Sequence, residues 1–320
     1  MKKHSIRVLA VLFAVVFLIS GCGLFSLGKP TAASLAGKAF DNVEKSQSAE
    51  VKVSTVGDIT ATYEALNIGM NLDLKTDVNM EMTRDPKRRK GTVSMGIGAA
   101  GQEQTINGEF YTDTAEDGSD VTYVSWNQGE WIKKTGEPVE EADTEEAEEN
   151  PIKIPDSLAK SVGLLKALKD GSLTAELKEE TVTVNDKEAY QISCMVGGEL
   201  IKTMLLDEMT DKDDSTMDME AIDWGNVSIP VELYIYKESE LPARITMDVT
   251  SIASQLVEKM FKEAMTDLPL DNLRLDVNSY VVDITIDRYD EIEAIEIPAD
   301  AAAAKEAESL TPSMTDLLQF

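Results

Sequence analysis

The sequence predicts an α+β protein built on one large, curved antiparallel β-sheet, with a few amphipathic helices on the apolar face of the sheet. Three observations support this class. Predicted strands come in consecutive runs and do not alternate with helices, which argues against a parallel sheet. Long segments alternate strictly between apolar and polar residues, as antiparallel strands with one wet face do. The helical segments each carry a single apolar stripe.

The first 21 residues are predicted to be a lipoprotein signal peptide. A positive segment with Lys2, Lys3 and Arg7 precedes an unbroken apolar run over 8–19. This run is too short to span a membrane, which takes roughly 20 residues. It ends in Leu18-Ile19-Ser20-Gly21-Cys22, which resembles the lipobox of bacterial lipoproteins. The resemblance implies cleavage before Cys22, a diacylglycerol on its sulfur and anchoring at the extracytoplasmic face of the cell membrane. The alternative is an ordinary secretory signal with a coincidental cysteine.

Charge and composition exclude several classes of function. The net charge is −29, which becomes −32 once Lys2, Lys3 and Arg7 leave with the signal peptide, so nucleic acid is an unsuitable partner. The one histidine, His4, also lies in the signal peptide, which excludes histidine-based catalysis and histidine-ligated metal sites in the mature chain. We therefore expect no enzyme, no metal site and no cofactor. Cys194 is interpreted as a small buried apolar residue.

The chain divides into a signal peptide (1–21), the lipidated cysteine with a tether (22–32), a sheet domain (33–299) and an Ala-rich, partly helical tail (300–320). An acidic linker over 137–150 interrupts the domain. Its first part predicts, in order, a helix over 34–43, strands from 49 and over 67–82, a basic turn over 84–90, a return strand from 93, and strands over 104–112, 120–127 and 130–134.

After the linker, a helix begins at Asp156 or Ser157. Then come, in order, strands over 172–178 and 180–196, a short helix over 199–206, an acidic loop over 209–220, a hairpin over 228–250, an amphipathic helix over 251–266 and a last strand from 273. Asn185-Asp186 is a turn signal within the second strand segment. The last strand changes phase at Asn278-Ser279, which predicts a β-bulge there.

Four stretches carry a family resemblance: residues 123–134 (YVSWNQGEWIKK), 184–190 (VNDKEAY), 231–236 with 241–247 (VELYIY, LPARITM) and 295–298 (IEIP). The chain resembles the superfamily of LolA/LolB lipoprotein carriers and LppX/LprG-type lipoproteins, and most of all Gram-positive lipoproteins of that build. The resemblance covers roughly residues 33–298. It implies an open half-barrel whose concave apolar face, lidded by helices, holds acyl chains. LolA itself is soluble, whereas this chain is predicted to be anchored, and no gating residue of the family maps onto it.

The apolar strand faces supply the candidate ligand-lining residues. Methionine is unbranched and polarizable and accommodates varied partners, so these faces suit a flexible acyl chain. The alternative is that the same side chains only pack the helices onto the sheet. The candidates are Met70, Leu72, Leu74, Met80, Met82, Met95, Met260 and Met265.

Other segments carry weaker signals. A basic turn could contact anionic lipid head groups or cell-wall polymers, or be an ordinary solvated hairpin tip; its residues are Arg84, Lys87, Arg88, Arg89 and Lys90. The acidic segment from Asp211 fails the calcium-loop template, because Thr216 and Ile222 replace its Gly and Glu. Trp126 and Trp131 flank a tight turn and are interpreted as rim or core packing, not as a sugar platform.

Together these features predict a membrane-anchored extracytoplasmic lipoprotein that binds a lipid or another hydrophobic molecule as a carrier, store or sensor. The alternative is a non-enzymatic cell-envelope scaffold or accessory subunit that binds a protein or a cell-wall partner.

Overall fold

The fold is known from a computed structural model that describes residues 30–63, 68–115, 118–136, 156–206, 222–264, 273–307 and 309–310. Its sheet has 13 strands. They are β1 (Ser48–Tyr63), β2 (Ile68–Thr83), β3 (Arg88–Ala99), β4 (Gln102–Thr114), β5 (Asp120–Trp126), β6 (Ile132–Thr135), β7 (Ala175–Leu177), β8 (Val182–Val184), β9 (Lys187–Gly197), β10 (Ser228–Tyr236), β11 (Pro242–Asp248), β12 (Leu273–Asp287) and β13 (Lys305–Glu306). The helices are α2 (Ala32–Val43), α3 (Asp156–Lys169), α4 (Gly198–Leu206), the 3-10 turn η3 (Trp224–Asn226), α5 (Thr250–Ala264) and α6 (Ala299–Ala302).

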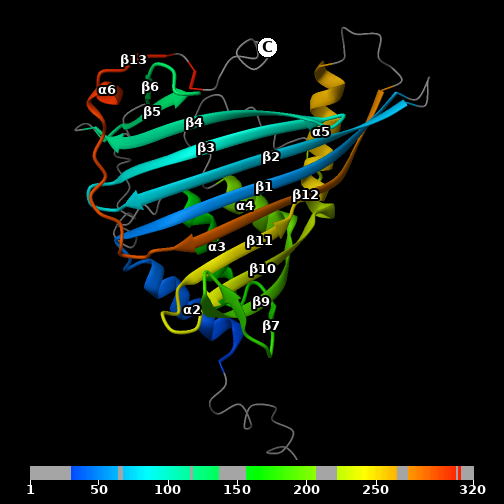
Figure 1. The fold of residues 1–320 in the computed structure, drawn as a ribbon. Coiled ribbons are helices and arrows are strands. Elements are labelled where there is room, and N and C mark those ends of the chain that lie inside the picture. Colours follow the sequence, from blue (N-terminus) through cyan, green and yellow to red (C-terminus); the bar gives the residue numbers. More distant parts are fainter. Residues whose placement is uncertain are drawn as a thin grey trace, which may run out of the picture.

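The sheet is open and almost entirely antiparallel, as predicted. Its strand order is β13-β6-β5-β4-β3-β2-β1-β12-β11-β10-β9-β7, with β8 beside β9, and only the β13–β6 pair is parallel. The longest strands, β1, β2 and β12, lie side by side in the middle (Figure 1). Because β1 pairs with β12, the first and last long strands of the chain meet at the centre. This arrangement confirms the predicted α+β class with one large antiparallel sheet.

Strand register gathers the apolar residues on one face. Across β1, β2, β3 and β4, Thr55 lies opposite Thr76, which lies opposite Met95, which lies opposite Ile106. Because side chains alternate with a period of two, an unbroken register keeps the apolar set of every strand on the same side. We call this side, on which the helices pack, the inner face, and the other side the outer face.

The inner face carries glycines that lie directly beneath aromatic rings. A Cβ atom on Gly57, Gly91 or Gly108 would lie 2.7 Å from an atom of the ring of Tyr280, Phe110 or Trp126, respectively. In each case the glycine and the aromatic residue are direct cross-strand partners. Glycine is therefore required at these positions because the rings occupy the space above the backbone, an arrangement used to bend sheets.

Helices α2 and α3 seal part of the inner face. Thr31 and Ser34 form a capping box at the start of α2, with hydrogen bonds of 3.1 and 3.0 Å. One continuous core joins the apolar stripes of α2 and α3 to strands at both ends of the chain; its members include Leu35, Ala39, Val51, Met82, Leu165, Leu168, Ile192, Leu233 and Ile286. The α5 residue Ile252 belongs to the same core. The prediction of amphipathic helices on the apolar face is thus confirmed.

The predicted bulge, basic turn and C-terminal tail can each be compared with the strand boundaries in the structure. The β-bulge in β12 is confirmed, because Ser279 pairs with Asp58 and Val277 pairs with Ile59, which leaves Asn278 as the extra residue. The predicted turn over 84–90 is too long, since β3 already begins at Arg88. Its basic residues enter the strand because acidic neighbours pair with them, as described below. The predicted tail is also not separate, since β13 pairs with β6.

Some predictions fall outside the described residues. These are the signal peptide, Cys22, the acidic linker over 137–150, the acidic loop over 209–220 and Met265. No helix within the described residues combines the length and apolar composition that crossing a membrane requires.

Candidate functional site

The two ends of the central strands differ in how the inner face is covered. The inner-face residues of the proximal half of the β1–β2 pair, defined as residues 49–53 and 78–83, belong to the same core as the apolar stripes of α2 and α3. There Met80 and Met82 are 8% and 2% exposed. Both were candidate ligand-lining residues, and the structure places both in the packed core. Their burial agrees with the packing alternative raised by the sequence, and a ligand-lining role for them stays a prediction.

The distal half, defined as residues 57–63 and 68–74, exposes apolar side chains on the same face. Ile68, Met70 and Ile97 are 59%, 43% and 54% exposed. Leu72, Leu74 and Met95 are half-buried. Ile106 of β4 is also half-buried, whereas Ile59 of β1, on the same face, is buried at 6% exposed. Together these residues form the distal apolar face: Ile59, Ile68, Met70, Leu72, Leu74, Met95, Ile97 and Ile106.

This face is distinctive because large apolar side chains rarely stay exposed in a group on a soluble surface unless they bind something. Four of the predicted lining residues lie on it, namely Met70, Leu72, Leu74 and Met95, and their role stays a prediction. Met260 lies on α5, and its side chain is not among those described. Ile68 and Ile97, the most exposed members, were not among the candidates. Their period-two phase with Met70 and Met95 was the signal that could have identified them.

The basic residues after β2 are engaged within the protein. Arg84 donates to the carbonyl oxygens of Glu44 and Val43 at the end of α2. Lys87 contacts Asp120 at 3.1 Å. These contacts secure the turn between β2 and β3 against α2 and β5, so neither cation extends freely into solvent.

Arg88 and Lys90 are paired on β3. The Arg88 guanidinium makes two hydrogen bonds to Asp113, of 3.0 and 3.1 Å, and donates to the carbonyl of Ile295 at 3.0 Å. The bond to Asp113 raises the pKa of Arg88. Lys90 Nζ lies 2.7 Å from Glu81 Oε2, and its hydrogen bond lowers the pKa of that carboxyl group. Arg89 lies opposite Met82 and Thr112 in the register. The surface-contact role of these residues stays a prediction.

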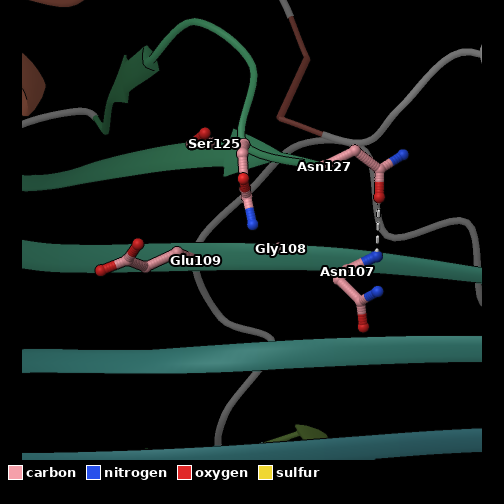
Figure 2. A pocket seen from close by; sticks show the side chains of 6 residues that line it. Asn107, Gly108, Glu109, Ser125 and Asn127 are labelled. Carbon is pink, nitrogen blue, oxygen red and sulfur yellow. Dashed lines mark hydrogen bonds between the residues drawn. The ribbon is translucent and has the colours of Figure 1, made fainter.

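The outer face carries polar depressions near the ends of the strands. One, of about 320 Å³, is lined by Asn107, Gly108, Glu109, Ser125, Asn127 and Gln128 (Figure 2). The backbone N–H of Asn107 donates to Asn127 Oδ1 at 3.0 Å across its rim. A second depression, of about 570 Å³, adjoins it beside α6 and β13. A third, of about 390 Å³, lies where the segment after β12 passes the ends of β1 and β2.

Cys194 is buried in the core, as predicted. Burial, with a smaller contribution from the charge of Glu232, raises the pKa of the thiol to about 11. A thiol in this state is protonated at neutral pH and is a poor nucleophile. Among the described residues, no group of three or more His, Cys, Asp or Glu side chains is placed to hold a metal ion.

Several solved structures are similar to this chain. LprF from Mycobacterium bovis is 14% identical, with a TM-score of 0.38 over 86% of this chain and 100% of that chain. A LolA superfamily protein from Nitrosomonas europaea is 9% identical, with a TM-score of 0.19 over 84% of this chain and 96% of that chain. A β-barrel-like protein of the domain of unknown function DUF1849 from Brucella abortus is 8% identical, with a TM-score of 0.21 over 74% and 96%.

At these identities the similarity concerns the fold alone. None of the curated proteins compared with the chain matches it. The model of a family of unknown function, DUF6612, matches residues 31–306, and the chain therefore belongs to that family.

Proposed function

We propose that the protein binds a lipid or another hydrophobic molecule on the distal apolar face, and that it does so while anchored to the membrane through Cys22. One observation carries the proposal: Ile68, Met70 and Ile97 are each more than 40% exposed on the inner face of neighbouring strands. Covering such a surface with a hydrocarbon chain releases about 25 cal/mol for every Å² of apolar area removed from water.

The composition of the face favours a flexible apolar ligand. Met70 and Met95 are unbranched and adapt to ligands of varied shape. The distal apolar face also lacks a charged member, whereas a protein partner would usually meet a polar rim with a few charges. The resemblance to lipoprotein carriers adds the expectation of acyl chains. The internal ion pairs of Arg88 and Lys90 weigh against the alternative of a scaffold that uses the basic segment.

A fluorescent fatty acid and native mass spectrometry test this proposal. Residues 23–320 would be produced without the signal peptide and the lipidated cysteine, which leaves every described element intact. We expect the wild type to carry or take up an apolar ligand. Replacement of Met70 and Ile97 by Asp should weaken uptake by about tenfold or more, because a ligand would have to desolvate two carboxylates.

Val56→Asp is the matched control. Val56 is 50% exposed on β1, and it lies opposite Lys75 on the outer face. Its replacement should leave uptake unchanged. Equal uptake by the double variant and the wild type would overturn the proposed site, and ligand-free wild-type protein that takes up no fatty acid would overturn the proposed function. Separately, Cys22→Ser should release the full-length protein from the membrane fraction.

A further inference from the structure

The depression of about 570 Å³ lies on the outer face, on the opposite side of the sheet from the distal apolar face. Strand register builds its floor. Glu109 of β4 pairs with Ser125 of β5, and Trp131 precedes Ile132, which pairs with Val124. Trp131 therefore continues the outer-face row of Glu109 and Ser125. The opposite wall comes from the segment around α6 and β13, with Asp300, Ala303, Ala304 and Lys305.

The two tryptophans of this hairpin have different environments. Trp126 lies over Gly108 on the inner face, and its Nε1 donates to the carbonyl of Leu310 at 2.7 Å. This confirms the packing interpretation for Trp126. Trp131 instead lines the depression, and its ring centroid lies 5.6 Å from that of Tyr111, with the planes tilted by 57°. An aromatic pair of this geometry holds the indole in place.

Tyr111 also positions a carboxylate. Its hydroxyl donates to Glu109 Oε1 at 3.0 Å. Burial, together with the hydrogen bond to Glu109 and the nearby charge of Asp300, raises the pKa of Tyr111 to about 12. The phenol is therefore protonated at neutral pH and keeps this hydrogen bond. Tyr111 of β4 thus contacts both the indole of Trp131 and the carboxylate of Glu109.

The remaining lining groups define the chemistry of a ligand. Glu109, Glu130 and Asp300 offer carboxylate oxygens, Gln128 offers an amide, and Lys305 is the single cation among the lining residues. Three carboxylates against one cation disfavour an anionic ligand. The carboxylates also do not gather into a metal-binding group among the described residues. Separate, planar acceptors beside an aromatic ring instead suit a molecule with several hydroxyl donors and apolar C–H groups.

We propose that this depression binds a saccharide, with a sugar ring against Trp131 and its hydroxyl groups bonded to Glu109, Glu130 and Asp300. The size agrees, because small-molecule sites typically occupy about 300–1,000 Å³. The adjoining depression of about 320 Å³ shares the lining residues Glu109, Ser125 and Gln128. It extends the site toward the amides of Asn107 and Asn127, which are labelled in Figure 2, so the ligand is an oligosaccharide.

Calorimetry and saturation-transfer NMR with the full chain test the saccharide site. The protein would be kept in a zwitterionic detergent, since detergents with sugar head groups would compete. The probes are the β-1,4-linked trimers of N-acetylglucosamine and of glucose, and the α-1,4-linked trimer of glucose. At least one trimer should bind. Trp131→Ala should weaken its binding by about tenfold or more, and Glu130→Gln by a few-fold, through the loss of one acceptor.

A second variant keeps the test decisive if Trp131→Ala does not fold. Ala303 is exposed on the wall of the depression, so Ala303→Trp should fill the site while both Tyr111 and Trp131 keep their own side chains. Met70→Asp, on the inner face, should leave saccharide binding unchanged, which separates this site from the proposed apolar one. Failure of all three trimers to bind, or binding that both Trp131→Ala and Ala303→Trp retain, would overturn the inference.

Discussion

Met82 and Met70 occupy the same face of the same strand, yet their surroundings are opposite. Met82, in the proximal half, is 2% exposed and packs in the core with residues of α2 and α3. Met70, in the distal half, is 43% exposed. Residue type, strand and phase are identical, so the difference comes only from what covers each end of the strand. The comparison teaches that one apolar strand face can serve as core over half its length and as a candidate binding surface over the other half.

The largest expected effect comes from truncating the two methionines. Met82→Ala should lower the free energy of unfolding by about 2–5 kcal/mol, because it opens a cavity in a sealed core. Met70→Ala should change it by no more than about 0.5 kcal/mol, because the side chain is largely solvated already. Urea titration of both variants at neutral pH measures the contrast. Similar losses at both sites would show that the distal half is packed as tightly as the proximal half.

The next largest change in the free energy of unfolding is expected from replacing glycines near the two halves by alanine. Gly91 of β3 pairs with Met80 of the proximal half. A Cβ there would clash with the Asn79 carbonyl oxygen and lie 2.7 Å from the ring of Phe110. Gly91→Ala should therefore cost about 1–3 kcal/mol through overpacking. At Gly69, in the distal half, a Cβ atom would meet nothing closer than 3.8 Å. Gly69→Ala should therefore be neutral or slightly stabilising, because alanine lowers the entropy of the unfolded chain. Thermal unfolding of the pair provides the measurement, and a neutral Gly91→Ala would contradict the close contact.

The smallest expected effect is electrostatic and belongs to the proximal half. Lys90 chiefly, and Arg288 to a smaller extent, lower the pKa of Glu81 below its ordinary value of 4.5 despite partial burial. A carboxyl group whose pKa is lowered by folding contributes stability above its unfolded pKa and loses it as the pH falls through the folded value. Glu81→Gln should thus cost less than about 1 kcal/mol at pH 7, and its deficit should shrink below pH 4.5.

Urea midpoints at pH 7 and at about pH 3.5 check this expectation. Asp73→Asn is the matched control, because Asp73 is an exposed carboxylate in the distal half of the same strand. Its unfolding curves should follow those of the wild type at both pH values. A deficit for Glu81→Gln that stays constant with pH would indicate a packing effect and not the ion pairs with Lys90 and Arg288.

Much of the fold could be predicted because it depends on local patterns. Strict alternation over 67–82 fixed the length and the two faces of β2. A one-residue change of phase located the bulge at Asn278. The turn boundary at Arg88 could not be predicted, since it depends on the pairing of Arg88 with Thr83 of β2 and on the contact of its side chain with Asp113 of β4. The split of the candidate methionines was equally hidden, because the alternation of apolar and polar residues is the same around Met82 as around Met70.

The sequence by itself determined the antiparallel class of the sheet and the apolar character of its inner face, because both depend on a period of two residues. The signal peptide stays a prediction from composition. Only the tertiary structure decided which half of that face is buried in the core and which half is exposed. The helices that share the core with Met82, α2 and α3, are separated along the chain by more than a hundred residues and pack against each other. Burial of a strand face by helices depends on how segments distant in the sequence pack together, and no local sequence pattern predicts it.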